Sequence, residues 1–189
     1  MWTSLRRVAR PSADPVELDE AKHHLRVNGT NDDSLIKRLI RSAADQIEGP
    51  HGCGIAITQQ QWDLVFDAFP SCIEIPLVPL AQVDSIKYID LDAVEQTLSS
   101  ATYEVDVYRG RVRPVSGSSW PSTKTVFNAV SVRFTCGYSD VPEDLKAAVL
   151  LIVGDRYAHR EDTITGTIVS ELPSGVAAIL NSYRVGRFA

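Results

Sequence analysis

"RFTCGYSDVPEDLKAAVLLIVGDRYAHRED", residues Arg133 to Asp162, joins a predicted strand to a predicted helix. Apolar side chains alternate along the chain up to Cys136, which is typical of a half-buried strand, and Gly137 ends it. Pro142 suits the first helical turn, because an N–H there has no partner within the helix. The wide apolar stripe of the predicted helix consists of Leu145, Ala148, Val149, Ile152, Val153 and Tyr157. Such a helix is expected to be buried in its own core or against a neighbouring subunit.

Two further helices are predicted near the N-terminus. In "ELDEAKHHLRV", Leu18, Ala21 and Leu25 fall on one face of a short helix. In "DSLIKRLIRSAADQIE", residues Asp33 to Glu48, apolar pairs recur at intervals of about four and basic residues occupy the other face. "GPHGCG" then ends the helix, because Gly and Pro are poor helix formers. The first dozen residues, with their basic and proline content, predict an extended arm.

Between these helices the hydrophobic period changes to two. Trp62, Leu64 and Phe66 alternate with other residues as in a half-buried strand. "CIEIPLVPL" predicts a short extended segment, "VDSIKYIDLDAVEQTLS" two strands with a turn at Asp90 to Ala93, and "YEVDVYRGRVRPV" two more that turn at Arg109–Gly110. "AVSVRFTCGY" supplies the last strand. This block therefore contains about six strands.

The fold class predicted from this order is α+β. Two N-terminal helices and one C-terminal helix form a bundle, a block of antiparallel strands is inserted between them, and an extended tail follows. The chain is predicted to be a single domain, with a helical part at 16–50 and 140–160, an inserted β part at 56–138 and a tail at 161–189. Within the tail, "GVAAILNSY" reads as a short helical piece.

Composition narrows the classes of function. The 189 residues are 44% hydrophobic and carry a formal net charge of −5, so bulk positive charge does not direct the chain to nucleic acid. Basic residues cluster at both termini. Cys53, Cys72 and Cys136 have neither zinc-site spacing nor an even number, which favours reduced thiols in an intracellular assembly site. No signal peptide or membrane span is visible, so we expect a soluble protein without a membrane partner.

Few residues suggest chemistry. In "HGCG", His51 and Cys53 are the best candidates for a nucleophile and its base, but residues two apart in a Gly-rich loop need not face each other. The adjacent His23 and His24 point in different directions from a helix and are expected on the surface. The loop containing Asp90 and Asp92 lacks the ligand series of a calcium loop. No nucleotide-binding or hydrolase motif is present, so we predict no enzyme, no cofactor and no metal.

The ordered set of segments resembles the phage head–tail connector (adaptor) family, which includes the adaptors of gene transfer agents. The resemblance runs from about Val16 to Val185. It departs at "EGPHGCG", where members of the family tend to carry an aromatic residue and a Thr-Gly. The segments that carry it are "ELDEAKHHLRV", "NDDSLIKRLIRSAADQIE", "ITQQQWDLVFDAFP", "IEIPLVPLAQVDSIKYID", "YEVD", "GRVRP", "VSVRFTCGY", "VPEDLKAAVLLIVGDRYAHRE" and "ELPSGVAAILNSYRV".

The resemblance implies a structural protein of the virion neck, assembled in the cytoplasm of a bacterial host. Copies are expected to form a dodecameric ring beneath the portal protein. The ring would extend the channel through which double-stranded DNA passes without sequence-specific binding, and would meet a stopper or tail-terminator protein. Two alternatives remain: a stopper or tail-completion protein of the same neck, and a small DNA-packaging enzyme such as a nuclease.

Two groups of residues are candidates for the contacts that this role needs. The C-terminal "SYRVGRFA" combines aromatic and arginine side chains, which often anchor protein interfaces. Its candidates for docking on the portal are Tyr183, Arg184, Val185, Arg187 and Phe188. The candidates for contact between neighbours in the ring are Leu145, Val149, Ile152 and Tyr157.

Overall fold

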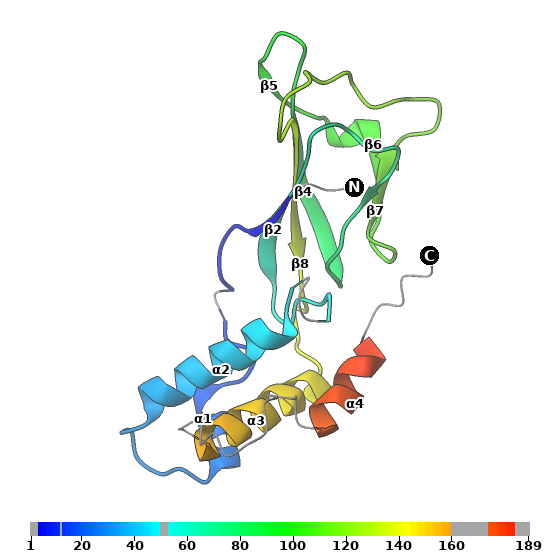
Figure 1. Ribbon diagram of the computed structural model, residues 1–189. Helices are drawn as coiled ribbons and strands as arrows, with labels where there is room; N and C mark the ends of the chain where they lie inside the picture. Colours follow the sequence, from blue (N-terminus) through cyan, green and yellow to red (C-terminus); the bar gives the residue numbers. More distant parts are fainter. Residues whose placement is uncertain (1–3, 12, 50–52, 160–173, 184–189) are drawn as a thin grey trace, which may run out of the picture. The chain divides into compact units, whose positions relative to one another are not determined.

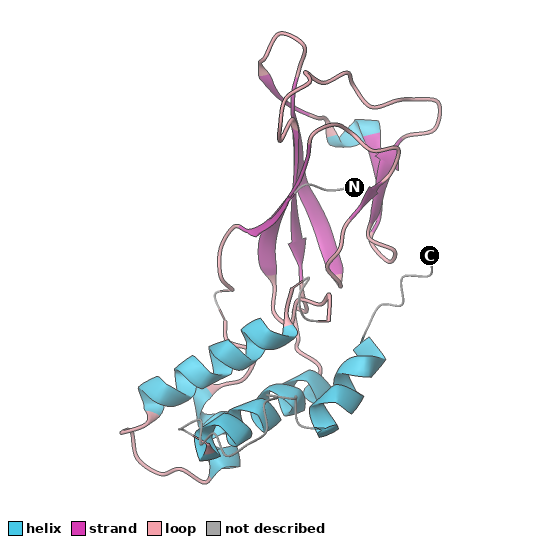
Figure 2. Cartoon of the chain, in the orientation of Figure 1, coloured by secondary structure: helices cyan, strands magenta, loops and turns pink. Residues whose placement is uncertain are grey.

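The computed structural model describes residues 4–11, 13–49, 53–159 and 174–183. The chain forms two compact units. Met1–Pro11 and Gln59–Tyr138 make up one, called here the β unit, and Ser12–Thr58 and Ser139–Ala189 make up the other, the helical unit. Figure 2 shows the strands in the first and helices α1 to α4 in the second. The predicted α+β class is therefore confirmed.

The β unit contains a five-stranded antiparallel sheet with the order β1-β2-β8-β4-β5. The strands are β1 (Ser4–Arg7), β2 (Gln60–Phe66), β8 (Val130–Cys136), β4 (Leu80–Ile89) and β5 (Glu95–Thr97). The predicted turns lie where the sequence placed them, between β4 and β5 and between β6 (Tyr103–Asp106) and β7 (Arg111–Pro114). Figure 1 shows β2, β8 and β4 running side by side through the unit.

Register in this sheet follows the alternation of apolar residues. Trp62 pairs with Phe134, and Leu64 with Val132, so that large buried side chains share one face. A shift by one residue would turn this whole set toward solvent, which fixes the pairing. The partner strand β4 adds Ile86 opposite Val132 on the other side. The core of the unit is thus built by the period-two pattern seen in the sequence.

A smaller antiparallel sheet has the order β3-β7-β6. Its strands are β3 (Ile73–Glu74), β7 (Arg111–Pro114) and β6 (Tyr103–Asp106), and the 3-10 helix η1 (Ser100–Thr102) leads into β6. Ile73 and Val112 face each other across β3 and β7 and are fully buried. Gly110 has φ +62° and lies against the backbone of Ile75, so the turn between β6 and β7 requires glycine.

The helical unit contains α1 (Leu18–Leu25), α2 (Asp33–Ile47), α3 (Glu143–Ala158) and α4 (Ser174–Tyr183). Helix α3 packs against each of the other three (Figure 1). The core of this unit is formed by apolar residues at helical spacing. They are Ala21, Ile36, Ile40, Ala43, Ile47, Leu145, Ala148, Val149, Ile152, Val153, Val176 and Leu180.

Side-chain hydrogen bonds connect α2 and the residue before it to α3. Arg156 donates hydrogen bonds to Ser42 Oγ and Gln46 Oε1, both at 2.6 Å. The hydroxyl of Tyr157 donates to the carboxylate of Asp32, just before α2. The C-terminal half of α3 is thereby held along α2 by polar contacts as well as by its apolar face.

The segment after α2 folds back on the helix end. Ile55, Ala56 and Ile57 are buried there, and the buried carboxylate of Glu48 accepts a hydrogen bond of 2.8 Å from the Ile57 N–H. The Glu48 carboxylate can be buried here because it accepts a hydrogen bond from the backbone N–H of Ile57, which is then also satisfied. This contact fixes the chain as it leaves the helical unit.

The N-terminal arm, predicted as extended, is paired in the sheet. Ser4–Arg7 forms β1, which pairs with β2 from Arg7↔Trp62 to Ser4↔Val65. This strand was not predicted, because its sequence, Ser-Leu-Arg-Arg, has a single large apolar residue and carries little hydrophobic signal. The short helical piece predicted within the tail is confirmed as α4, which buries Val176 and Leu180 and packs against α3.

Candidate interaction surfaces

Of the five residues predicted to dock on the portal, the structure describes only Tyr183. It is half-buried at the last position of α4. Tyr183 follows Val176 and Leu180 at helical spacing, so it continues the face of α4 that packs on α3. Arg184, Val185, Arg187 and Phe188 lie outside the described residues.

The structure places the four ring-contact candidates in two different environments. Leu145, Val149 and Ile152 are buried within the helical unit of a single chain. They therefore have no surface to offer a neighbouring subunit unless the unit repacks. Tyr157 is half-buried and bonded to Asp32, so it is the member of the set that retains exposed surface. On the same helix Leu151 is 39% exposed, which the sequence pattern did not single out.

The residues considered for catalysis or metal binding do not converge in the part of the chain that is described. His51 lies outside it, and Cys53 is a half-buried free thiol. His23 and His24 are exposed, and the ring of His24 lies beside Gly154 on α3. Within the described ranges no group of three or more His, Cys, Asp or Glu side chains could hold a metal ion.

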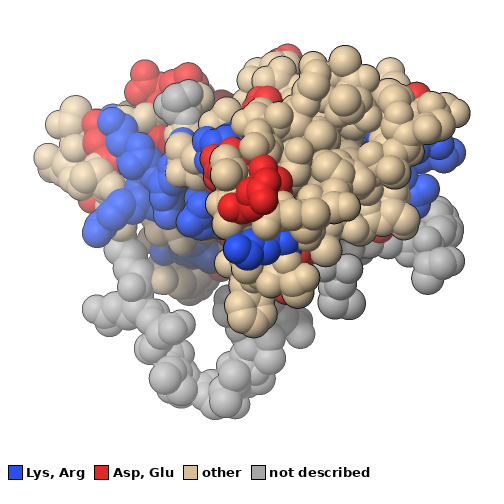
Figure 3. Space-filling view, turned by 90° about the horizontal axis from the view of Figure 1, so that it is seen from above, with Lys and Arg blue, Asp and Glu red and all other residues tan. Residues whose placement is uncertain are grey.

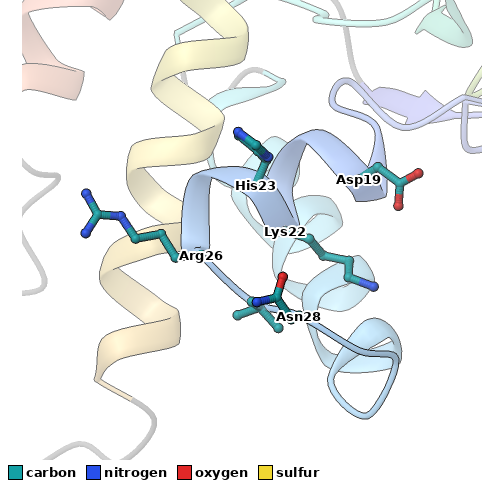
Figure 4. Close-up of a pocket in the computed structure, with 6 residues that line it drawn as sticks. Asp19, Lys22, His23, Arg26 and Asn28 are labelled. Atoms are coloured by element: carbon teal, nitrogen blue, oxygen red, sulfur yellow. The ribbon is translucent and has the colours of Figure 1, made fainter.

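A hollow beside α1 is lined by residues of both charges. Figure 4 shows Asp19, Lys22, His23, Arg26 and Asn28 around it. The ammonium group of Lys22 is 2.8 Å from the carboxylate of Asp33, so one cationic group that lines the hollow is already paired. Arg26 ends α1 in a left-handed conformation, with φ 56°. The hollow is open and its polar groups point outward rather than toward a common centre, which does not favour a small-molecule site.

The β unit has a polar cluster that spans three neighbouring strands. The Asp63 carboxylate is only 4% exposed and lies between two arginines. Arg133 bonds it at 2.8 and 3.0 Å, and Arg6 of β1 approaches at 3.3 Å. These hydrogen bonds, those from Arg133 above all, hold the pKa of Asp63 below its ordinary value. The cluster ties β1, β2 and β8 together side by side.

A second polar group lies on the adjacent strand β4. Asp84 accepts hydrogen bonds from Gln61, Gln82 and Thr135, at 3.3, 2.6 and 2.9 Å. These partners belong to β2, β4 and β8, so the contacts again join strands. Both polar clusters thus have a structural explanation, and neither leaves a reactive group directed at an open site.

Asp90, in the loop that lacks a calcium-binding ligand series, also has a structural role. Its carboxylate accepts the backbone N–H groups of Asp92 and Val94 at 3.0 and 2.9 Å and the side-chain amide of Gln96 at 2.8 Å. These bonds, with that from Val94 first, lower the pKa of Asp90. The carboxylate therefore fixes the hairpin between β4 and β5, as the reading of a solvated turn predicted.

Large apolar side chains are exposed in the turns of the β unit. Phe127 is 85% exposed in the loop before β8, and Leu91 is 67% exposed in the turn between β4 and β5. Tyr108, in the turn between β6 and β7, is 95% exposed. Sequence reasoning missed these residues. The available signal was a large apolar residue within a stretch otherwise typical of a solvated loop, as Phe127 is in "STKTVFN".

Charge is distributed in small groups. On the face shown in Figure 3, Lys and Arg side chains lie close to Asp and Glu side chains. No helix in the described ranges is long and apolar enough to cross a membrane. Most of the large exposed apolar side chains of the described residues lie in the turns and loops of the β unit.

The fold of this chain is similar to that of chains from gene transfer agent (GTA) particles. A chain in the neck of an empty GTA particle, computed with C6 symmetry, matches with a TM-score of 0.80 and 24% identity. A chain in the virion of a native GTA particle matches at 0.77 and 24%, and one in the neck of a native particle, computed with C12 symmetry, at 0.71 and 22%. Each match covers 99% of this chain and 98% of the other.

Sequence comparison identifies the family. A family model described as head completion protein matches residues 16–185, which include parts of both units. The chain belongs to the head completion protein family. No curated protein matches the sequence. The resemblance to neck proteins of phage-like particles, first seen in the ordered segments, is confirmed.

Proposed function

We propose that this chain is a structural adaptor in the neck of a tailed phage or a phage-like particle such as a gene transfer agent, where it joins the head to the tail. The observation that carries this proposal is the family match over residues 16–185. It extends over the helical unit and the inserted strands together, so it concerns the whole architecture rather than one common helical motif. The shared fold over 99% of the chain supports the same role.

Copies of the chain form a ring, dodecameric in the assembled neck, beneath the portal protein. A head-to-tail contact between identical subunits closes into a ring when its rotation angle divides a full turn. In the helical unit, Tyr157 and Leu151 have exposed surface for such a contact. The ring extends the DNA channel, and the net charge of −5 suits a protein that lets DNA slide past without retaining it.

The C-terminal segment docks on the portal. Tyr183 ends a helix that is packed on α3, so the residues that follow start from a fixed point of the helical unit. Arg184 and Arg187 would pair with acidic groups, while Val185 and Phe188 would fill apolar pockets. A stopper or tail-terminator protein binds on the far side of the ring. The protein is then a component of the virion neck that is assembled in the cytoplasm of a bacterial host.

No catalytic step belongs to this role. The match to a head completion protein family favours an adaptor over a packaging nuclease. The carboxylates of the β unit point the same way, because they hold strands and turns together rather than a metal ion, as seen for Asp63, Asp84 and Asp90. Replacing His51 and Cys53 by Ala should leave particle assembly intact. A hydrolytic activity that disappears in this double variant would contradict the proposal.

The test is a deletion of residues 184–189, compared with a variant in which these residues are replaced by Gly and Ser at equal length. Both variants should melt as the full chain does, because the described core ends at Tyr183. Both should lose binding to purified heads that carry the portal, by about thirtyfold or more for the loss of two interface anchors. Unchanged head binding would refute docking through this segment.

A cryo-EM reconstruction of the particle neck separates the adaptor from the alternatives. Density for this chain directly beneath the portal is the expected result. A position one layer further from the head would identify the chain as a stopper or tail-completion protein instead.

A further inference from the structure

Four exposed apolar side chains gather at one end of the five-stranded sheet. They are Leu91 and Val94 in the turn between β4 and β5, and Val126 and Phe127 in the loop before β8. We call this group the apolar tip. The pairing of Tyr88 with Val130 and the hydrogen bond from Ile89 N to Ala129 O bring the two segments to the same end of the sheet, as Figure 1 shows.

The apolar tip is held in place by the backbone around it. The loop before β8 is tied to β4 by the bond from Lys124 N to Ile89 O at 3.0 Å. It is tied to the end of β2 by the bond from Asn128 N to Asp67 Oδ1 at 2.8 Å. The neighbouring hairpin is fixed by the three hydrogen bonds that Asp90 accepts. An exposed group whose backbone is already ordered loses little conformational entropy on binding, which favours a role in recognition.

The exposure of these side chains is unusual for a surface without a partner. Phe127 is 85% and Leu91 67% exposed, whereas single exposed apolar residues elsewhere on a surface need no explanation. Several exposed apolar side chains in neighbouring segments, with polar residues beside them, are typical of a protein–protein contact. Aromatic residues are also the usual anchors of such contacts.

Charges around the apolar tip indicate the chemistry of the partner. Acidic side chains outnumber basic ones there: Asp67, Asp90, Asp92 and Glu95, against Lys87 and Lys124. Lys87 and Glu95 pair with each other at 2.8 Å, which leaves Asp67, Asp90 and Asp92 against Lys124. A negative border disfavours DNA phosphates and anionic lipid headgroups, and favours a surface with Lys or Arg side chains.

We propose that the apolar tip inserts into an apolar pocket, bordered by Lys or Arg side chains, on the protein that follows the adaptor on the tail side of the neck. The inference rests on the proposed adaptor function. It assigns the head contact and the tail contact to different units of the chain, since the proposed portal-docking segment leaves the helical unit and the apolar tip belongs to the β unit. Leu91 and Phe127 are the anchors, and the exposed carboxylate of Asp92 faces the basic border of the pocket.

The experiment uses the full-length chain, purified heads that carry the portal, and purified tails of the same particle. Head binding is measured by co-sedimentation and tail joining by electron microscopy of the product. The variant Leu91→Asp/Phe127→Asp should bind heads as the unchanged chain does and lose tail joining by about thirtyfold or more. Asp92→Lys should weaken tail joining in the same direction, and this loss should diminish as salt concentration rises.

Tyr108→Asp is the control, because it places a negative charge on an aromatic position that is 95% exposed in a different turn. It should join tails normally. If the tip variant joins tails as well as the unchanged chain, or if Tyr108→Asp fails equally, the assignment to the apolar tip is overturned. Loss of head binding by the tip variant alone would overturn the assignment to the tail side.

Two further measurements keep the outcomes distinct. Melting of each variant is compared with that of the unchanged chain, and Leu91→Asn/Phe127→Asn replaces the charged variant if the latter does not fold. Failure of the unchanged chain to bind heads would instead count against the proposed adaptor function, whatever the tip variants do.

Discussion

Replacing Arg133 by Ala is expected to destabilise the β unit through the carboxylate that it leaves behind. Asp63 is 4% exposed, and Arg133 supplies its two short hydrogen bonds, at 2.8 and 3.0 Å. After the substitution Asp63 retains only the longer contact with Arg6, whose side chain is 75% exposed. A buried carboxylate would then be poorly compensated, and the cost arises from Asp63 rather than from the lost arginine.

The magnitude can be set from the two limits. Breaking a fully buried ion pair costs about 3–5 kcal/mol, whereas an exposed pair contributes about 0–1 kcal/mol. Arg133 is itself 44% exposed, and Arg6 remains, so the expected loss lies between these limits, at about 2–3 kcal/mol. For a chain of this length that corresponds to a fall in melting temperature of roughly 4–12 °C.

The assay is urea unfolding at neutral pH, followed by tryptophan fluorescence and checked by thermal melting. Arg111→Ala is the matched control, because Arg111 pairs with Glu74 at 3.2 Å while both side chains are more than half exposed. It should cost less than about 1 kcal/mol. Adding Asp63→Asn to Arg133→Ala should recover part of the stability, since the uncompensated charge is then gone. The reasoning is refuted if Arg133→Ala and Arg111→Ala lower the free energy of unfolding equally. It is also refuted if the double variant Arg133→Ala/Asp63→Asn has a lower free energy of unfolding than Arg133→Ala.

Three other predictions concern single side chains. The pKa of Asp63 is lowered from 3.8, so the contribution of this carboxylate to stability is complete above that pH and is lost as pH falls through the lowered pKa. The difference in unfolding free energy between the unchanged chain and Asp63→Asn should therefore shrink below about pH 4. Urea unfolding at several pH values measures this difference. Arg26 has φ 56° at the end of α1, so Arg26→Gly should raise the unfolding free energy by about 0.5–1 kcal/mol, and an unchanged or lower melting temperature would contradict this. Tyr157→Phe removes the hydrogen bond to Asp32 and should cost about 1–2 kcal/mol in chemical unfolding, with the exposed Tyr108→Phe as a neutral control.

Much of the fold could be predicted because its signals are local. The change of hydrophobic period from about four to two separated α2 from β2, and turn residues such as Gly110 marked where hairpins reverse. The strand β1 could not be found in this way. It exists because Arg6 and Arg7 find partners on β2, namely Asp63 and the ring of Trp62, and such long-range pairing leaves no periodic trace in four residues.

The candidate sites were harder to predict, because exposure is a property of the whole fold. Phe127 and Ile73 are both large and apolar, yet one is exposed and the other fully buried. The polar stretch around Phe127 is a weak signal of exposure, but the spacing of apolar residues does not distinguish the two positions. The distinction depends on which segments cover each position, and the loop before β8 has no described element over Phe127.

The same reasoning explains why the apolar stripe of α3 could not show which of its residues contact a neighbouring copy. An apolar stripe has the same period whether it faces the subunit's own core or a neighbouring copy, so Leu145 and Val149 were equally compatible with either. The structure resolves the choice, because α1, α2 and α4 all pack against α3. These three helices account for the burial of Leu145, Ala148, Val149, Ile152 and Val153 within one chain. In the proposed ring, a contact through α3 would therefore use side chains that stay accessible in the single chain, such as Leu151 and the exposed part of Tyr157.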